Sequence, residues 1–503
     1  MSPTLVCGRE RGWSGVPVPK NWQVVAGSAA AGFAVALTAV AAAGPWESGQ
    51  RTAERAIAAS RDGQGKQARP HKKGATGGHK GALAPVPPAA PEVLAAVTGP
   101  HNAPVPTKAG LAGRLGPLLY DGALGSLTTG AVVDAVSGRT VWGQRPGTPA
   151  VPASTTKVAT AVASLSLLGA DHRLTTSVVA AGKDRVVLVG GGDPTLTARA
   201  KPGGGWTAAS LRTLASDTVR ALRAKGVRSV RLTYDTSLFT GPAVHPIGHN
   251  DNIAPVTALM ADEARSDGKS VKGPAARHAD PAAKAAEAFA DLLRKGGVKV
   301  EGAVKAGKAP SHAQAADRLA EVRSAPLADL VERMLTNSDN DIAEALARHT
   351  ALAADRPGSF SGGAKAIGSA LRELGLPLKG ARFADGSGLD RTDHLTAEQL
   401  ARLLALAADP DHPELRPVLT GLPVAGFSGS LRERFTSSRG GAGLVRAKTG
   451  TLTGVNALAG TVVDADGRLL TFAFLTNGTT NPVAAQSALD RLAAGLTTCG
   501  CRT

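Results

Sequence analysis

Cysteine is scarce in this chain of 503 residues, which has only three. Three cysteines cannot form a disulfide framework, and no two have the Cys-x-x-Cys spacing of a zinc or thioredoxin-like site. Cys499 and Cys501 could pair in an exported protein, but two free thiols at a frayed C-terminus are the favoured interpretation. The eleven histidines include no H-x-x-x-H pair on a helix. We therefore expect neither a metal nor another cofactor.

Aromatic side chains are also scarce, with nine phenylalanines, five tryptophans and two tyrosines. The hydrophobic fraction is nevertheless 43% and consists largely of Ala, Val and Leu, which predicts aliphatic cores. The chain is long enough for two to four domains, so a peptide, a fibre or a wholly disordered chain is excluded. With 61 glycines and 32 prolines we expect many turns and a linker.

Acidic residues are outnumbered, with 40 Asp and Glu against 57 Lys and Arg, which gives a net charge of +17. Such a balance points to nucleic acid, an anionic membrane or an acidic polymer nearby. The first 105 residues carry +6 of this charge, and the remainder is spread out without a basic block interleaved with aromatics. This distribution argues against a nucleic-acid partner.

Charge is absent from residues 24–44, which would form a helix of about 31 Å, enough to cross a bilayer core. Basic residues precede this stretch, so residues 1–23 should stay in the cytoplasm and the rest should be exported. The run 41–43 also resembles an A-x-A cleavage site, so membrane anchor and cleaved signal peptide both remain open. Residues 45–106 are rich in Pro, Ala and Lys without an amphipathic period, which predicts a disordered linker.

Hydrophobic periodicity beyond the linker predicts a mixture of strands and helices. A hairpin is expected over 131–143, a helix over 155–168, and strands over 175–180 and 186–189. Between 172 and 325 short strands and turns accompany one clear amphipathic helix, 281–295. In the remainder, helices are expected over 327–335, 341–352, 364–374 and 396–406. A β-rich end follows, with strands over 444–452, 455–463 and 469–476 and a last helix over 482–496.

Ser154-x-x-Lys157 stands at the start of the helix predicted over 155–168. Residues three apart share one face of a helix, so the amine comes within reach of the hydroxyl. A lysine can take the proton of a serine nucleophile if burial and neighbouring cations lower its pKa. The first-turn dipole of the helix would favour a developing oxyanion.

Two further short motifs follow in order. Ser338-Asp339-Asn340 stands at a break between two helices and offers a hydroxyl and an amide. Lys448-Thr449-Gly450 lies in a strand, where its cation and hydroxyl can hold a carboxylate and its glycine lets a substrate backbone approach. A lone Ser-x-x-Lys is weak, and Ser266-x-x-Lys269 is a decoy without a helix. The three motifs in this order and context make chance improbable.

This set resembles the low-molecular-mass class C penicillin-binding proteins, the D-alanyl-D-alanine carboxypeptidase/endopeptidase family. The resemblance covers about residues 110 to 497 and includes LVGGGDPTL, APVTALMADEAR, FADGSGLDR and FSGSLRERF. It implies an α+β fold with a serine β-lactamase/transpeptidase-like core, an antiparallel sheet flanked by helices plus a helical lobe, and inserted, partly β domains. The expected parts are a catalytic domain from 107–171 and 326–497, an insertion over 172–325, and a tail over 498–503.

The family implies a role for each motif residue. Ser154 would be the acylated nucleophile, Lys157 its base and Ser338 a proton relay to the leaving D-alanine. Asn340 would hold the peptide amide, and Lys448 and Thr449 would bind the terminal carboxylate. Gly450 and Thr451 complete the substrate-binding set. The backbone N–H groups of Ser154 and Thr451 would form the oxyanion hole.

The expected activity is penicillin-inhibited serine D,D-peptidase action on peptidoglycan stem peptides in the bacterial cell envelope, with the carboxypeptidase and endopeptidase balance left open. Alternatives are a β-lactamase or esterase on the same scaffold, or a non-catalytic cell-wall-binding protein. The 181 residues from Lys157 to Ser338 exceed what a compact β-lactamase needs.

Four residues near FADGSGLDR remain to be placed. Asp385 and Ser387 either line the cleft or shape a glycine turn. Asp390 and Asp393 stand where the family pattern has Ser and Asn. Both would add negative charge near the cleft rim, which leaves the substrate preference open.

Overall fold

Two β-sheets and a group of helices organise the part of the chain that the computed structural model describes, residues 103–200, 205, 207–310 and 317–500. The segments predicted over 1–23 and 24–44, nearly all of 45–106 and the last three residues lie outside these ranges. Within them, no helix combines the length and the apolar character that a membrane crossing requires.

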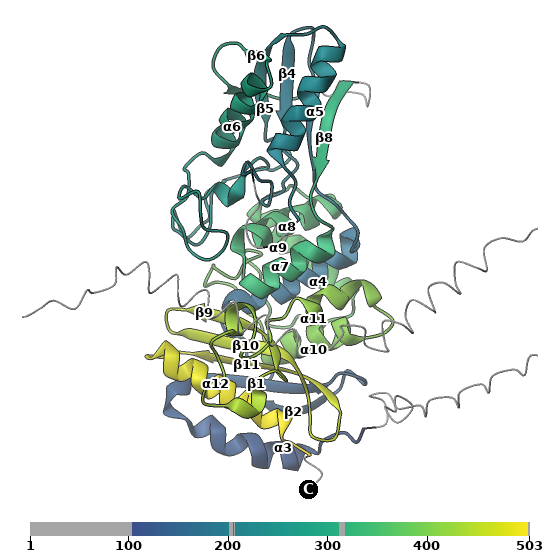
Figure 1. The fold of residues 1–503 in the computed structure, drawn as a ribbon. Helices are drawn as coiled ribbons and strands as arrows, with labels where there is room; N and C mark the ends of the chain where they lie inside the picture. The colour runs from purple at the N-terminus through teal and green to yellow at the C-terminus, as the bar shows by residue number, and fades with distance from the viewer. Residues whose placement is uncertain (1–102, 201–204, 206, 311–316, 501–503) are drawn as a thin grey trace, which may run out of the picture. The chain divides into compact units, whose positions relative to one another are not determined.

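The first sheet is antiparallel and has five strands (Figure 1). Its first and last strands in the chain, β1 and β11, pair directly, so the two ends of the described chain meet in one sheet. The hairpin predicted over 131–143 is the β1–β2 pair. In sheet order the strands are β2 (Thr140–Gln144), β1 (Leu127–Asp134), β11 (Leu469–Asn477), β10 (Val455–Val463) and β9 (Arg446–Leu452).

Both faces of this sheet are buried, as the alternation along β11 shows. Phe472 and Phe474 pack under α3 (Lys108–Leu115) and α12 (Pro482–Thr497), whereas Ala473 faces a second core. Side chains of a strand point alternately to its two faces, so one strand serves both cores. Figure 1 shows α12 and α3 along the first face.

The second core also contains the helices that follow the predicted pattern. The helix α4 is buried over most of its length and contacts each of the other five helices of this group. These helices are α4 (Thr156–Leu168), α7 (Leu327–Asn337), α8 (Asn340–Ala353), α9 (Phe360–Glu373), α10 (Ala397–Ala408) and α11 (Arg416–Thr420).

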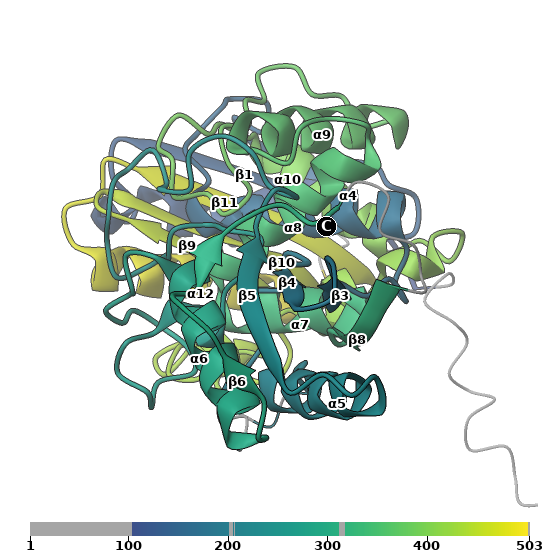
Figure 2. The ribbon, with the colours of Figure 1, turned by 90° about the horizontal axis from the view of Figure 1, so that it is seen from above.

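The second sheet lies within the segment between Leu174 and Ser324. The Ser324 N–H donates to the Leu174 carbonyl, so the two ends of this segment lie side by side. It mixes parallel and antiparallel pairs, and α5 and α6 pack on it and on each other (Figure 2). Its elements are β3 (Thr175–Ala180), β4 (Arg185–Val189), α5 (Leu211–Ala224), β5 (Ser229–Asp235), α6 (Pro281–Lys295), β6 (Lys299–Val300), β7 (Lys305–Ala306) and β8 (Arg318–Arg323).

Two expectations from the sequence are wrong here. The segment has a second helix, α5, whose apolar positions from Leu211 to Leu222 repeat at helical spacing behind the N-cap Ser210. Cys499 is buried against α12 and is disulfide-bonded, so it is not a free thiol at a frayed end. Cys7 and Cys501 lie outside the described residues.

A buried ion pair joins the last residue of β1, Asp134, to the residue before β11, Arg468, and generates a stability prediction. Arg468 donates from Nε and Nη2 to the two carboxylate oxygens of Asp134, at 2.6 and 2.8 Å. Asp134→Asn should lower the free energy of unfolding by about 3 kcal/mol because it leaves Arg468 short of its counter-charge. We place the loss at the lower end of the usual range because Arg468 keeps its bond to the Ala103 carbonyl.

Thermal unfolding measures this loss. Asp184→Asn is the matched control because its pair with Arg231 is exposed, with side chains 55% and 63% accessible. It should leave Tm unchanged. Equal losses of Tm in the two variants would contradict a special role for the buried pair.

Candidate active site

Ser154 lies in a 3₁₀ turn, Ala153–Thr155, that leads directly into α4. Ala153 has φ +48°, a conformation that is costly for a residue with a side chain. Thr155 closes the turn by donating from Oγ1 to the Pro152 carbonyl at 2.7 Å. The strained turn thereby presents Ser154 at the N-terminal end of a helix whose following turns are buried.

Lys157 is fully buried one turn further along α4. Its Nζ lies 2.9 Å from Ser154 Oγ, 2.6 Å from Asn340 Oδ1 and 2.7 Å from the Ser387 carbonyl oxygen. A neutral amine has two N–H groups and one lone pair. Two N–H bonds to the amide and carbonyl oxygens therefore leave the lone pair for the Ser154 hydroxyl.

Burial lowers the pKa of Lys157 to about 8, although four acidic side chains nearby oppose that shift. These are Asp385, Glu344, Asp339 and Asp341. A lysine with this pKa is neutral in an appreciable fraction of molecules near neutral pH, as a general base must be.

The second motif forms the break between α7 and α8. Ser338 ends α7 in the left-handed conformation, φ +58° and ψ +42°, and Asp339 caps α8 by accepting from the Ile342 N–H. Asn340 turns its Oδ1 toward Lys157, and its Nδ2 donates to the Asn252 carbonyl at 3.0 Å. The break therefore aims a hydroxyl and an amide at the Ser154 turn.

Lys448 extends from β9 toward this break. Its Nζ donates to Ser338 Oγ and to the Thr449 carbonyl, both at 2.8 Å. Burial, together with the positive charge of Lys157, holds the pKa of Lys448 well below its usual range. The hydroxyl of the next residue, Thr449, lies 2.8 Å from Ser430 Oγ. Two buried amines and the hydroxyls of Ser154, Ser338, Thr449 and Ser430 therefore lie in one site.

Gly450 lies where β9 passes closest to the Ser154 turn. A Cβ atom at this position would lie 2.5 Å from the Pro152 carbonyl oxygen, far inside normal contact. The next residue, Thr451, lines the same cleft as Ser154. The glycine therefore allows a close approach between strand and turn, beyond any contact with a substrate.

Asp385 and Ser387 belong to a buried loop behind Lys157. Asp385 accepts from three backbone N–H groups, those of Ser387, Gly388 and Asp390, and from His245 Nε2 at 3.0 Å. Ser387 contributes its main-chain oxygen to Lys157. Both residues therefore shape a turn, and neither lines the cleft.

Asp393 is not at the cleft rim, contrary to the expectation from the sequence. Its side chain is fully buried away from the cleft, and its Oδ1 accepts a hydrogen bond from the Ala384 N–H. Burial and the neighbouring Asp385 carboxylate raise its pKa to about 10. It is therefore neutral at physiological pH. Asp390 is half-buried and accepts from the backbone and side chain of Thr392.

Residues from all three motifs line one cleft of about 450 Å³. Ser154, Ser338 and Thr449 all line it. Part of its wall comes from the segment between Leu174 and Ser324, through Asn252, Arg265, Lys272, Gly273, Pro274 and Arg277. Short motifs cannot reveal that wall, because its residues lie far from them in the chain.

Two groups of buried side chains have the donor atoms for a metal ion: His245, Glu344 and Asp385, and separately Glu263, Asp339 and Asp341. The sequence singled out neither group as a metal site. Glu344 accepts from the Gly386 and Ser387 N–H groups with one oxygen, so it supports the loop behind Lys157. The second group is paired with arginines.

Comparison with known proteins gives consistent matches over this whole region. A family model described as D-Ala-D-Ala carboxypeptidase 3 (S13) matches residues 111–274 and 267–496. Carboxypeptidase DacB of Mycolicibacterium smegmatis is 41% identical over 440 residues, which cover 85% of this chain and 93% of that protein.

The chain belongs to the D-Ala-D-Ala carboxypeptidase 3 (S13) family. A D-alanyl-D-alanine carboxypeptidase of an Actinomadura species is 29% identical over 450 residues, or 73% of this chain and 80% of that protein. The crystal structure of penicillin binding protein 4 from Haemophilus influenzae has a TM-score of 0.61 at 24% identity, covering 77% and 98% of the two chains.

Membership of the S13 family confirms three predictions from the sequence. The resemblance to D-alanyl-D-alanine carboxypeptidases is correct, the α+β penicillin-binding fold is correct, and the chain is a serine hydrolase of this class. A peptidase that acts on the cell wall works outside the cytoplasm, so the extracytoplasmic location follows from the family.

The close approach at Gly450 predicts a defect in an S13 enzyme. Gly450→Ala should push β9 away from the Ser154 turn and slow covalent labelling of the protein by penicillin by about 10-fold or more, since small displacements of reacting groups cost large factors. Stopped-flow acylation measures this rate. Gly454→Ala, at a turn where a Cβ meets nothing closer than 3.7 Å, is the control, although its φ of +73° should lower Tm. Equal acylation rates in wild type and Gly450→Ala would refute the packing argument.

Proposed function

We propose that this protein removes the terminal D-alanine from D-alanyl-D-alanine stem peptides, or cuts the related cross-links, through an acyl-enzyme on Ser154. The observation that carries the proposal is the 2.9 Å contact between Lys157 Nζ and Ser154 Oγ at the wall of a cleft that Ser338 and Thr449 also line. The family named above supports the reaction class.

Acylation begins with Lys157. Its neutral amine takes the proton of the Ser154 hydroxyl, and Oγ attacks the carbonyl carbon of the penultimate D-alanine. The oxygen that becomes negative lies near the N-terminal end of α4, where the helix dipole stabilises it. The backbone N–H groups of Ser154 and Thr451 are the proposed oxyanion donors.

Ser338 and Lys448 serve the leaving group. The Ser338 hydroxyl gives its proton to the departing nitrogen as the amide C–N bond breaks, and Lys448, which donates to Ser338 Oγ, replaces that proton. D-Alanine leaves as a free amino acid and the peptide remains as an ester on Ser154. Water then attacks the ester carbonyl and gives up a proton to the Lys448 amine, which lost one during acylation. The ester C–O bond breaks, Lys157 returns the proton that it took to Ser154 Oγ, and the shortened peptide leaves.

Lys448 and Thr449 also explain a preference for a free C-terminus. The carboxylate of an arriving peptide favours the ammonium form of Lys448, whose pKa burial has lowered. The Thr449 hydroxyl adds a hydrogen bond beside it. Asn340 offers its amide to the peptide backbone once the substrate displaces the Asn252 carbonyl.

Export of the enzyme and its partition into domains are part of the proposal. Residues 24–44 would direct the chain through the membrane, as a cleaved signal or as an anchor, and residues 45–106 would link it to the catalytic part. We assign residues 107–171 and 326–497 to the catalytic domain and 172–325 to the insertion. Stem peptides and β-lactams are the expected ligands.

Labelling with a fluorescent penicillin tests the assignment of Ser154. Wild-type protein should form one long-lived covalent adduct per chain, and Ser154→Ala should form none, because the alanine has no hydroxyl to acylate. Release of D-alanine from a D-alanyl-D-alanine peptide should be lost in parallel. Decoy variant Ser266→Ala should label normally. A folded wild type that stays unlabelled, or that hydrolyses penicillin rapidly instead of retaining it, would overturn the proposal.

The lowered pKa of Lys157 gives a second prediction. The deprotonated amine is the reactive form, so the rate constant for penicillin acylation should rise with pH, by about tenfold from pH 6 to pH 7, and level off above about pH 8. Lys157→Arg should lose this dependence and acylate at least about 100-fold more slowly, since arginine stays protonated. A flat profile between pH 6 and 8 in the wild type would contradict the role of Lys157.

A further inference from the structure

A turn of the inserted segment holds three consecutive residues with side chains in a left-handed conformation. Asp262, Glu263 and Ala264 all have φ +53°. Only glycine adopts this conformation readily, and a run of three non-glycine residues is strained. Strain of this kind persists only where surrounding contacts hold the backbone, and those contacts identify what the turn serves.

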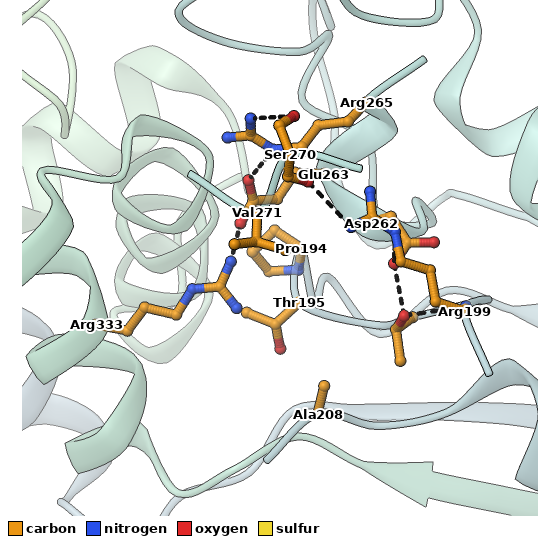
Figure 3. A pocket seen from close by; sticks show the side chains of 11 residues that line it. Pro194, Thr195, Arg199, Ala208, Asp262, Glu263, Arg265, Ser270, Val271 and Arg333 are labelled. Atoms are coloured by element: carbon orange, nitrogen blue, oxygen red, sulfur yellow. Dashed lines mark hydrogen bonds and ion pairs between the residues drawn. The ribbon is translucent and has the colours of Figure 1, made fainter. Parts of the chain in front are cut away.

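The Glu263 side chain faces two arginines. Its Oε2 lies 2.9 Å from Arg265 Nε, and its Oε1 contacts Arg333 Nη2. Figure 3 shows the guanidinium groups of Arg333 and Arg265 converging on this carboxylate. Arg333 belongs to α7, and its Nη2 also lies 3.7 Å from Asp339 Oδ2. The side chain of Glu263 is therefore linked to the residue that follows Ser338.

The main chain of Glu263 is linked to the other flank of the same motif. Its carbonyl oxygen accepts from Arg277 Nη1, which lies 2.8 Å from Asp341 Oδ2. The second oxygen of Asp341 accepts from the Ala254 N–H at 2.8 Å. Asp339 and Asp341 flank Asn340, so one residue of the turn holds the arginines that bind both neighbours of the catalytic amide.

The cluster contains equal numbers of acidic and basic side chains. Glu263, Asp339 and Asp341 bring three carboxylates, and Arg265, Arg277 and Arg333 bring three guanidiniums. Burial and the Asp339 carboxylate raise the pKa of Glu263, while Arg333 and Arg265 oppose that rise. A glutamine at position 263 has only one side-chain oxygen, so it would turn an N–H group toward one of the two guanidiniums and leave that group without its acceptor.

We propose that Glu263 is a positioning residue for the S13 reaction: its side chain and main chain hold Arg333 and Arg277, which fix the Ser338–Asn340 break in its catalytic conformation. Ser338 is itself left-handed, so it needs contacts on both sides to stay there. The insertion thereby acts on catalysis through the break as well as lining the cleft. This inference rests on the proposed function of Ser338.

The neighbouring residue of the same turn supplies a matched control. The Asp262 carboxylate accepts from Thr197 Oγ1 and the Ala198 N–H and lies 3.4 Å from Arg199, all within the inserted segment. Figure 3 labels Asp262 and Arg199 together, apart from the Arg333 side of the pocket. Asp262→Asn removes a charge from the strained turn without breaking a link to α7 or α8.

The test compares acylation by fluorescent penicillin in full-length variants. Glu263→Gln should acylate about 10-fold to 100-fold more slowly than wild type, because the break that carries Ser338 shifts. Asp262→Asn should stay within about twofold even if its Tm falls. The factor by which Glu263→Gln slows acylation should be at least about threefold smaller in a Ser338→Ala background than in the wild type. The reason is that the effects of residues that act through one another are not additive.

Each outcome decides the matter. Wild-type acylation in folded Glu263→Gln, an equal defect in Asp262→Asn, or an undiminished effect in the Ser338→Ala background would overturn the inference. If Glu263→Gln does not fold, Glu263→Asp replaces it: the retained carboxyl group should permit folding, and the shorter reach should still slow acylation more than Asp262→Asn does. Absence of labelling in the wild type would instead refute the proposed function, so the two failures are distinct.

Discussion

The withdrawal of the Lys157 amine from water is the constraint on which the site depends. A charged lysine in a protein interior is costly, and the cost appears as a pKa of about 8, which makes the amine a usable base. A buried amine without hydrogen-bond partners would also be unstable in this position, because its lost contacts with water would not be replaced. Asn340 and the Ser387 carbonyl meet them, so the second motif and the buried loop are both requirements of the first.

Acidic residues behind the amine limit how far its pKa can fall. Asp385 and Glu344 lie in the buried layer that organises the Ser387 loop, and both raise the pKa of Lys157 against the effect of burial. His245, which comes from the inserted segment, bonds to Asp385 at 3.0 Å. The segment between Leu174 and Ser324 therefore contacts residues around Lys157 as well as residues around Ser338, although it contains none of the three motifs.

The sequence predicts much of the local structure correctly. Strand β10 and helix α6 lie at their predicted bounds because each has clear periodicity and flanking turn residues. Helix α5 carried the same signal behind Ser210 and was missed. Ser430, Glu344 and His245 could not be found as parts of the site, because each is recognised only by contact with residues distant in the chain.

The sequence by itself determined the family, the fold class and the three motifs, since these rest on residue types at fixed short spacings. Only the tertiary structure decided that Asp393 is buried and neutral, that Gly450 makes room for the Pro152 carbonyl, and that Glu263 reaches the Ser338 break. The reason is physical. Burial and charge pairing depend on which distant segments exclude water from a side chain, and no local pattern records that.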